Sequence, residues 1–164
     1  MKTRIFLVLA VFLILGLAGS TAAAATDDTM PFVTDASVPF TAYYETTCWW
    51  VEFDAAEVEG EGLVTILRPR RPLELESAYH AYSWFNFDQG PPYPYWSEVT
   101  WTFANGDQLF LTLDGVAIPG YFEGTFQITG GTGMLESVTG AGDWWALILN
   151  EHDAEIYFDG ALTR

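Results

Sequence analysis

Basic residues are scarce in this sequence. Its 164 residues include 6 lysines and arginines against 22 aspartates and glutamates, and Lys2 is the single lysine. A chain with a formal net charge of −16 repels the phosphates of nucleic acids and the headgroups of anionic lipids. We therefore expect neither a nucleic-acid partner nor binding to an anionic membrane surface.

Cysteine is limited to Cys48. A disulfide needs two cysteines, so we expect the fold to depend on core packing and on closure of its sheet. Cys48 precedes Trp49 and Trp50, a context typical of a small buried apolar residue.

Motifs of known metal and hydrolase chemistry are also missing. The sequence contains no HxxxH, HExxH, CxxC or GxSxG pattern, and its two histidines are His80 and His152. We interpret His80 as a structural residue and His152 as a solvated turn residue. We therefore expect no metal, no cofactor and no identifiable catalytic residue, and we favour a non-catalytic domain.

A long hydrophobic run occurs only near the N-terminus. Lys2 and Arg4 precede an apolar run over residues 5–17, and four alanines follow at 22–25. This pattern predicts a secretory signal peptide over residues 1–25, too short to span a bilayer as a helix. We expect export to the periplasm or the medium, an irregular lead-in over residues 26–38, and one domain over residues 39–164.

Alternation of apolar and polar residues dominates the remainder of the chain. Val99, Trp101 and Phe103 fall on one side of a predicted strand, and Asn105-Gly106 predicts a tight hairpin after it. Further predicted strands cover residues 40–45, 47–53, 63–67, 73–76, 79–87, 109–113, 124–128, 144–149 and 155–162. We predict polar or glycine corners at 57–62, 130–133 and 140–142, and a proline-rich loop over 88–95. About eight short strands joined mostly by hairpins indicate an all-β fold, a single antiparallel, calycin-like β-barrel.

Glycine motifs in the C-terminal half carry a family resemblance. The strand ending in ITGGTG (128–133), the following TGAG (139–142), the hairpin at 105–107 and the closing residues 157–162 resemble the allene oxide cyclase-like barrel domains, relatives of the plant dirigent proteins. The resemblance extends from about Trp96 to the C-terminus and implies a barrel of the kind found in many bacterial exported proteins. Met134-Leu135 replaces the Arg-Phe pair that often follows GGTG in that family.

Aromatic residues are abundant, with 7 Trp, 8 Tyr and 12 Phe. The inward rings either fill the barrel or leave room for one small ligand. One hypothesis is that the domain binds a small apolar ligand in the barrel, or a partner through its aromatic surface, and we name Trp50, Tyr95, Trp96, Trp101 and Trp144 as candidate ligand-binding residues. A second hypothesis, implied by the resemblance, is a cyclase or isomerase. A third is a carbohydrate-binding or adhesion module that uses exposed Trp rings. In the pairs Trp49-Trp50 and Trp144-Trp145, we expect one ring inside and one outside.

Carboxylates in apolar strands are a further source of candidates. Glu45, Glu52, Glu98 and Glu123 lie in or beside predicted strands. A carboxyl group that points inward would have a raised pKa and would be a candidate general acid or base. If all four side chains point outward, they contribute only to the negative charge of the surface.

Overall fold

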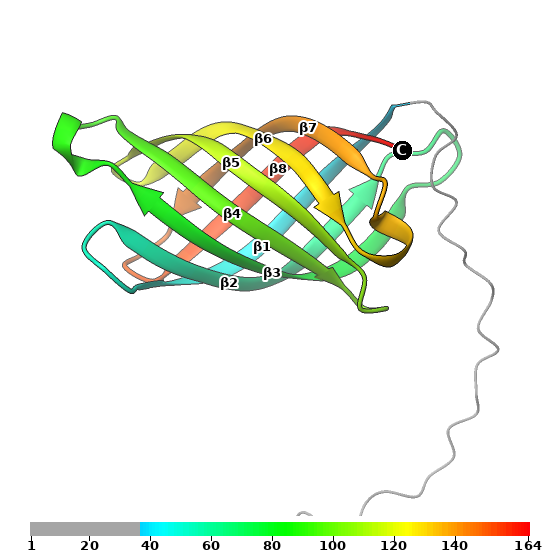
Figure 1. The fold of residues 1–164 in the computed structure, drawn as a ribbon, viewed down its shortest axis with the longest axis horizontal. Coiled ribbons are helices and arrows are strands. Elements are labelled where there is room, and N and C mark those ends of the chain that lie inside the picture. Colours follow the sequence, from blue (N-terminus) through cyan, green and yellow to red (C-terminus); the bar gives the residue numbers. More distant parts are fainter. Residues whose placement is uncertain (1–36) are drawn as a thin grey trace, which may run out of the picture. The chain divides into compact units, whose positions relative to one another are not determined.

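Eight antiparallel strands close into a barrel in the computed structural model of this chain, which describes residues 37–164 (Figure 1). The strands are β1 (Val38–Trp50), β2 (Ala55–Ile66), β3 (Leu73–Phe85), β4 (Tyr93–Phe103), β5 (Gln108–Ile118), β6 (Tyr121–Gly131), β7 (Thr139–Ile148) and β8 (Asp153–Thr163). Each strand pairs with the next, and β1 pairs with β8 to close the ring. The predicted all-β barrel of about eight strands is therefore confirmed.

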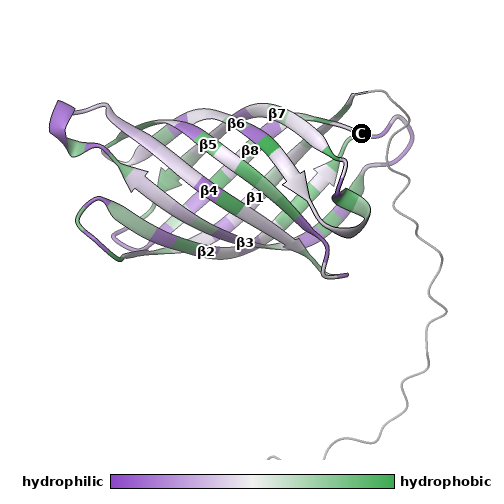
Figure 2. Ribbon diagram, in the orientation of Figure 1, coloured by the Kyte–Doolittle hydropathy of each residue, from purple (hydrophilic) through white to green (hydrophobic). Residues whose placement is uncertain are grey.

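Side chains alternate between the inside and the outside of the barrel along every strand. Phe126 and Ile128 of β6 are buried and Thr125 and Gln127 are exposed, as the alternation in the sequence predicts. Figure 2 shows the same alternation as interleaved hydrophobic and hydrophilic segments along the ribbons. The core is thus the interior of the barrel.

The two ends of the barrel differ in their connections. At one end lie the β1–β2 and β7–β8 turns, the β5–β6 turn, and the β3–β4 connection that carries the 3-10 helix η1 (Phe87–Gln89). We call it the η1 end; it is on the left in Figure 1. The opposite end, the η2 end, carries the 3-10 helix η2 (Gly133–Leu135) and the C-terminus.

Two predicted corners are wrong. Residues 57–62 lie in the middle of β2, where their glutamates point outward and Gly60 and Gly62 allow β1 to approach closely. Residues 140–142 lie inside β7, and the turn falls earlier, in the segment after β6 that buries Leu135 and Val138. Both predictions fail for the same reason. Glycine is used within these strands for close packing, and the sequence alone does not distinguish such a glycine from one that makes a turn.

Other boundaries shift by a few residues. The two strands predicted at 40–45 and 47–53 form one strand, β1, and the predicted 88–95 loop ends earlier, because β4 starts at Tyr93. The predicted signal peptide and residues 26–36 of the lead-in lie outside the described residues. Within residues 37–164, no helix is long and apolar enough to cross a membrane.

Candidate functional site

Aromatic rings gather at the η1 end of the barrel. Trp50, at the end of β1, lies 5.1 Å from Phe85 and 6.2 Å from Phe87, measured between ring centroids. Phe53 in the β1–β2 turn lies 5.6 Å from Phe87, and Phe122 of β6 lies 5.7 Å from Phe85. We call these five residues the aromatic mouth, since they come from strand ends and connections around one end of the barrel.

A row of hydroxyl groups lies inside the barrel next to this mouth. The Ser83 and Tyr95 hydroxyl oxygens are 2.9 Å apart, and Ser83 donates a hydrogen bond to Ser97 at 3.1 Å. Ser97 in turn donates to the carbonyl oxygen of Tyr82 at 3.0 Å. We call Ser83, Tyr95 and Ser97 the polar seam. Burial raises the pKa of Tyr95, which further disfavours ionisation of its hydroxyl.

Three buried donors in the described part of the chain have no hydrogen-bond acceptor. They are the hydroxyl of Tyr79 and the indole nitrogens of Trp101 and Trp144. All three side chains are at most 2% exposed. An unsatisfied buried polar group costs about 1–3 kcal/mol, so such groups are uncommon unless another molecule supplies the acceptor.

Small side chains occupy inward positions around the polar seam. Thr46, Ala56, Ala81, Ala146 and Ala154 are all buried on strands that run to the η1 end. The η2 half of the interior is instead filled by large apolar side chains: Phe40, Phe103, Leu109, Phe126 and Leu162. The η1 half of the interior therefore combines the polar seam with several small side chains, and the η2 half is mostly apolar apart from the buried hydroxyl pair of Tyr44 and Ser77.

The structure separates the five candidate ligand-binding residues. Tyr95 and Trp144 are buried together, with ring centroids 5.1 Å apart, and Trp50 lies in the aromatic mouth with 53% exposure. Trp101 is fully buried farther from the mouth, against Phe158. Trp96 lies on the outer face with 41% exposure. Three of the five thus belong to the η1 end.

The paired tryptophans follow the predicted pattern in one case. Trp144 is buried and Trp145 points outward, where it stacks on Tyr157 with an interplanar angle of 7°. Trp49 and Trp50 are both exposed, at 45% and 53%, so the prediction fails there. The reason is that β1 ends at Trp50, beyond the part of the barrel that could enclose a ring.

The interior offers no carboxylate or imidazole within the described residues. Glu45, Glu52, Glu98 and Glu123 are all exposed, which leaves hydroxyl and indole groups as the buried polar side chains. Cys48 is partly buried, and that burial raises the pKa of its thiol and disfavours the thiolate. A reaction of the cyclase type would have to use hydroxyl donors.

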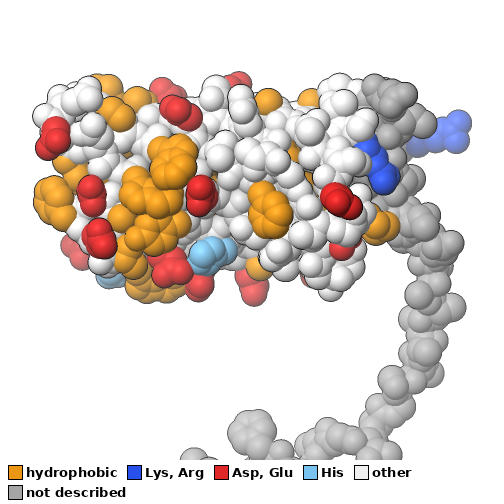
Figure 3. Space-filling view, in the orientation of Figure 1, with side chains coloured by type: hydrophobic (Ala, Val, Ile, Leu, Met, Phe, Trp, Pro, Cys, Tyr) orange, Lys and Arg blue, Asp and Glu red, His pale blue; other side chains and the backbone are white. Residues whose placement is uncertain are grey.

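The outer face carries a second aromatic group. The rings of Trp84 on β3 and Trp96 on β4 are stacked at 4.1 Å, and Tyr82 lies 4.6 Å from Trp84. We call these three residues the outer aromatic row. Figure 3 shows hydrophobic side chains gathered toward the η1 end with acidic side chains around them.

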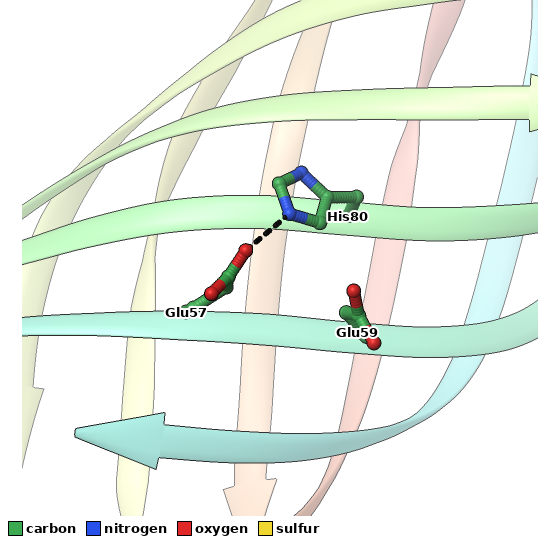
Figure 4. A group of neighbouring side chains, drawn as sticks. All are labelled: Glu57, Glu59 and His80. Carbon is green, nitrogen blue, oxygen red and sulfur yellow. Dashed lines mark hydrogen bonds and ion pairs between the residues drawn. The ribbon is translucent and has the colours of Figure 1, made fainter. Parts of the chain in front are cut away.

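Two further features lie outside the barrel. A groove of about 640 Å³ on β1–β4 is lined by Glu45, Glu61 and Glu76 among other residues. Glu57, Glu59 and His80 form a group of three potential metal ligands (Figure 4). Linear spacing does not reveal this group, because His80 meets the two glutamates only through the pairing of β3 with β2.

Comparison with known proteins supports the fold. No protein-family model matches the sequence, and no curated protein has significant similarity to it. A pterocarpan synthase dirigent protein superimposes with a TM-score of 0.53 at 12% identity, over 81% of this chain and 93% of that chain. A pyocyanin demethylase aligns with a TM-score of 0.42 at 11% identity, over 76% of this chain and 99% of that chain. The first likeness shows a dirigent-like barrel fold.

Proposed function

We propose that this dirigent-like barrel is a non-catalytic domain that binds a small, largely apolar molecule in the η1 half of its interior. The observation that carries the proposal is a pair of buried donors without acceptors, Trp144, whose ring packs on Tyr95 of the polar seam, and Tyr79, which lies deeper in the barrel opposite Trp101. A carbonyl or ether oxygen of the ligand would accept these hydrogen bonds and offset a cost of about 1–3 kcal/mol for each donor.

The surroundings of the two donors favour an uncharged ligand. The interior contains no arginine, lysine or histidine among the described residues that could pair with an anion, and no carboxylate that could pair with a cation. A charged molecule would lose its hydration without gaining a partner. The aromatic mouth would cover the apolar part of the ligand where it faces solvent.

We further propose that the chain is an exported member of the allene oxide cyclase-like and dirigent-like barrel proteins. The glycine motifs of residues 128–142 and the shared fold support this kinship. The charged and apolar pattern of residues 1–17 supports export to the periplasm or the medium. The mass of the protein recovered outside the cytoplasm should correspond to a chain that starts after residue 25. An intact Met1 would contradict export by this route.

Native mass spectrometry of the protein purified from its own host tests ligand binding directly. We expect an additional mass on the folded chain that disappears on denaturation. Recombinant protein should bind the uncharged fluorophore N-phenyl-1-naphthylamine, with a fluorescence increase on transfer to an apolar site. Trp50→Ala should weaken that binding by about tenfold or more, because 1.4 kcal/mol of lost ring contact corresponds to tenfold.

Trp96→Ala provides the matched control. It removes the same side chain at similar exposure from the outer face, and we expect less than about twofold change in affinity for the fluorophore. Equal losses in Trp50→Ala and Trp96→Ala would show adsorption to exposed rings and would contradict the proposal. Absence of both a retained mass and fluorophore binding would also contradict it.

A second candidate function is carbohydrate binding by the outer aromatic row. The supporting observation is the stack of Trp84 and Trp96 beside Glu98 and Asp114, since sugars stack on aromatic rings and donate hydroxyl hydrogen bonds to carboxylates. For carbohydrate binding, Trp96→Ala is the test variant and Trp50→Ala is the control. Trp96→Ala should abolish binding to an oligosaccharide array, whereas Trp50→Ala should leave it unchanged.

A further inference from the structure

Three potential metal ligands lie together on the outer face of β2 and β3. Glu57 and Glu59 are two residues apart on β2, so their side chains share that face, and His80 is the cross-strand partner of Glu59. The ligand atoms of the three residues all lie within 4.8 Å of one another. Nε2 of His80 lies 2.8 Å from Oε1 of Glu57. Figure 4 marks this contact with a dashed line.

The charges around His80 favour a cation. On the outer face, Glu61 is the next outward residue of β2, and Glu98 of β4 is the partner of Tyr82, the next outward residue of β3. In the part of the chain that the structure describes, the contact of His80 with Glu57 is the only ion pair, so no arginine neutralises these carboxylates. A divalent cation would relieve the repulsion among them.

We propose that Glu57, Glu59 and His80 bind a divalent cation of intermediate softness, with Zn²⁺ as the representative ion. One imidazole and two carboxylates suit zinc and its transition-metal neighbours, whereas Ca²⁺ and Mg²⁺ prefer a complete set of oxygen ligands. The imidazole of His80 therefore favours zinc and its transition-metal neighbours over Ca²⁺ and Mg²⁺.

The ligand atoms of the three residues can come close enough together to coordinate such an ion. Zinc bonds to nitrogen and oxygen are about 2.0–2.2 Å long, so tetrahedral ligand atoms lie about 3.3 Å apart. The contact of His80 with Glu57 is already shorter than that, and Glu59 needs only a side-chain rotation to approach. The His80 and Glu57 side chains are 50% and 42% exposed, which leaves them free to rotate and leaves a coordination position open to water.

The bound ion would link two adjacent strands from the outside, independently of the interior ligand site. Because the unfolded chain does not hold Glu57 and Glu59 near His80, binding should stabilise the folded state. The site therefore predicts a metal-dependent melting temperature even in a protein whose barrel interior binds nothing.

Isothermal titration of EDTA-treated protein with ZnCl₂ tests the proposal. We expect one Zn²⁺ per chain, a higher melting temperature with Zn²⁺, and much weaker binding of Ca²⁺ and Mg²⁺. His80→Gln should abolish the site. Glu57→Gln and Glu59→Gln should each weaken it by about tenfold or more, since even a supporting residue of a metal site contributes about 10–100-fold.

Glu61→Gln and Glu98→Gln are the matched controls. Each removes one negative charge at a neighbouring outward position but no proposed ligand, so we expect less than about threefold loss of affinity from screened surface electrostatics. Equal losses in ligand and control variants, or equal binding of Zn²⁺ and Ca²⁺, would reveal a diffuse acidic surface and would overturn the proposal. So would the absence of a one-to-one heat change. Circular dichroism in EDTA should show that all five variants fold.

Discussion

The ring of Phe126 on β6 lies over the backbone of Gly142, its cross-strand partner on β7. A Cβ atom at Gly142 would lie 2.8 Å from Cε1 of Phe126, and the carbonyl oxygen of Asp159 would be closer still. The same ring covers Gly160 of β8, where a Cβ atom would lie 2.6 Å from its Cζ. The glycines thus provide the space that a fully buried ring occupies.

Gly142→Ala should therefore lower the free energy of unfolding by about 1–3 kcal/mol, because the methyl group must displace the Phe126 ring or a neighbouring strand. Urea denaturation followed by tryptophan fluorescence measures the change. Gly130→Ala is the control: a Cβ atom there meets nothing nearer than Phe110 at 3.9 Å, and its effect should stay within about 0.5 kcal/mol. Similar losses in both variants would show that Phe126 is not the cause.

The same glycines explain what the sequence could and could not predict about the fold. Period-two alternation was sufficient to predict the inward positions of Trp101 and Phe126, and Asn105-Gly106 predicted a hairpin that the positive φ of Gly106 supports. Gly142 was assigned to a corner because its place within β7 depends on the aromatic ring of Phe126 on another strand. Local sequence carries no information about that ring.

The candidate site shows a similar limit. Neighbouring residues of one strand point to opposite sides, which separates Tyr95 from Trp96. Alternation alone cannot say that Trp50 lies beyond the last enclosed position of β1. It also cannot place His80 opposite Glu59, because that contact depends on the register of β2 against β3.

Removal of the Tyr79 hydroxyl should not destabilise the ligand-free protein. That group is buried without an acceptor, so Tyr79→Phe should leave the free energy of unfolding unchanged or raise it by about 1 kcal/mol. The hydroxyl of Tyr44 lies 2.6 Å from the Ser77 hydroxyl, and Tyr44→Phe should lower the free energy by about 1–3 kcal/mol. Chemical denaturation of the two variants measures both values.

A loss in Tyr79→Phe as large as that in Tyr44→Phe would mean that a partner, such as ordered water, already satisfies Tyr79. The same variant should weaken binding of the ligand retained from the native host, since the ligand would lose a donor. Greater stability combined with weaker binding is therefore the expected signature of a donor reserved for a ligand.

The free energy of unfolding should fall in alkaline solution, because several tyrosines have a higher pKa in the folded barrel than in the unfolded chain. Partial burial, the hydrogen bond to Glu45 and the charge of Glu155 raise the pKa of Tyr43 to about 12. Burial raises the pKa of Tyr44, Tyr79 and Tyr95 as well. The unfolded chain releases these protons near pH 10. The contribution of these tyrosines to the free energy of unfolding is thus complete below about pH 10, and it is lost as the pH rises toward about 12.

Urea denaturation at a series of alkaline pH values measures this loss. Tyr43→Phe removes one of the groups, so the decline of its unfolding free energy with pH should be shallower than in the wild type. Tyr93→Phe removes a tyrosine whose ring packs on Phe87 at the η1 end and serves as the comparison. A wild-type stability that does not change across the alkaline range would contradict the raised pKa values.

The stack of Trp84 on Trp96 should contribute measurable coupling energy on the outer face. The two residues are cross-strand partners with ring centroids 4.1 Å apart and an interplanar angle of 28°. Offset-stacked aromatic pairs contribute about 0.5–1.5 kcal/mol beyond area burial, so a double-mutant cycle with both residues changed to alanine should give a coupling in that range. A second cycle pairs Trp96 with Trp145, which lies on β7 and stacks on Tyr157 instead, and should give about 0.3 kcal/mol or less. Equal couplings in the two cycles would show that the loss comes from general destabilisation of the barrel and not from contact between the rings.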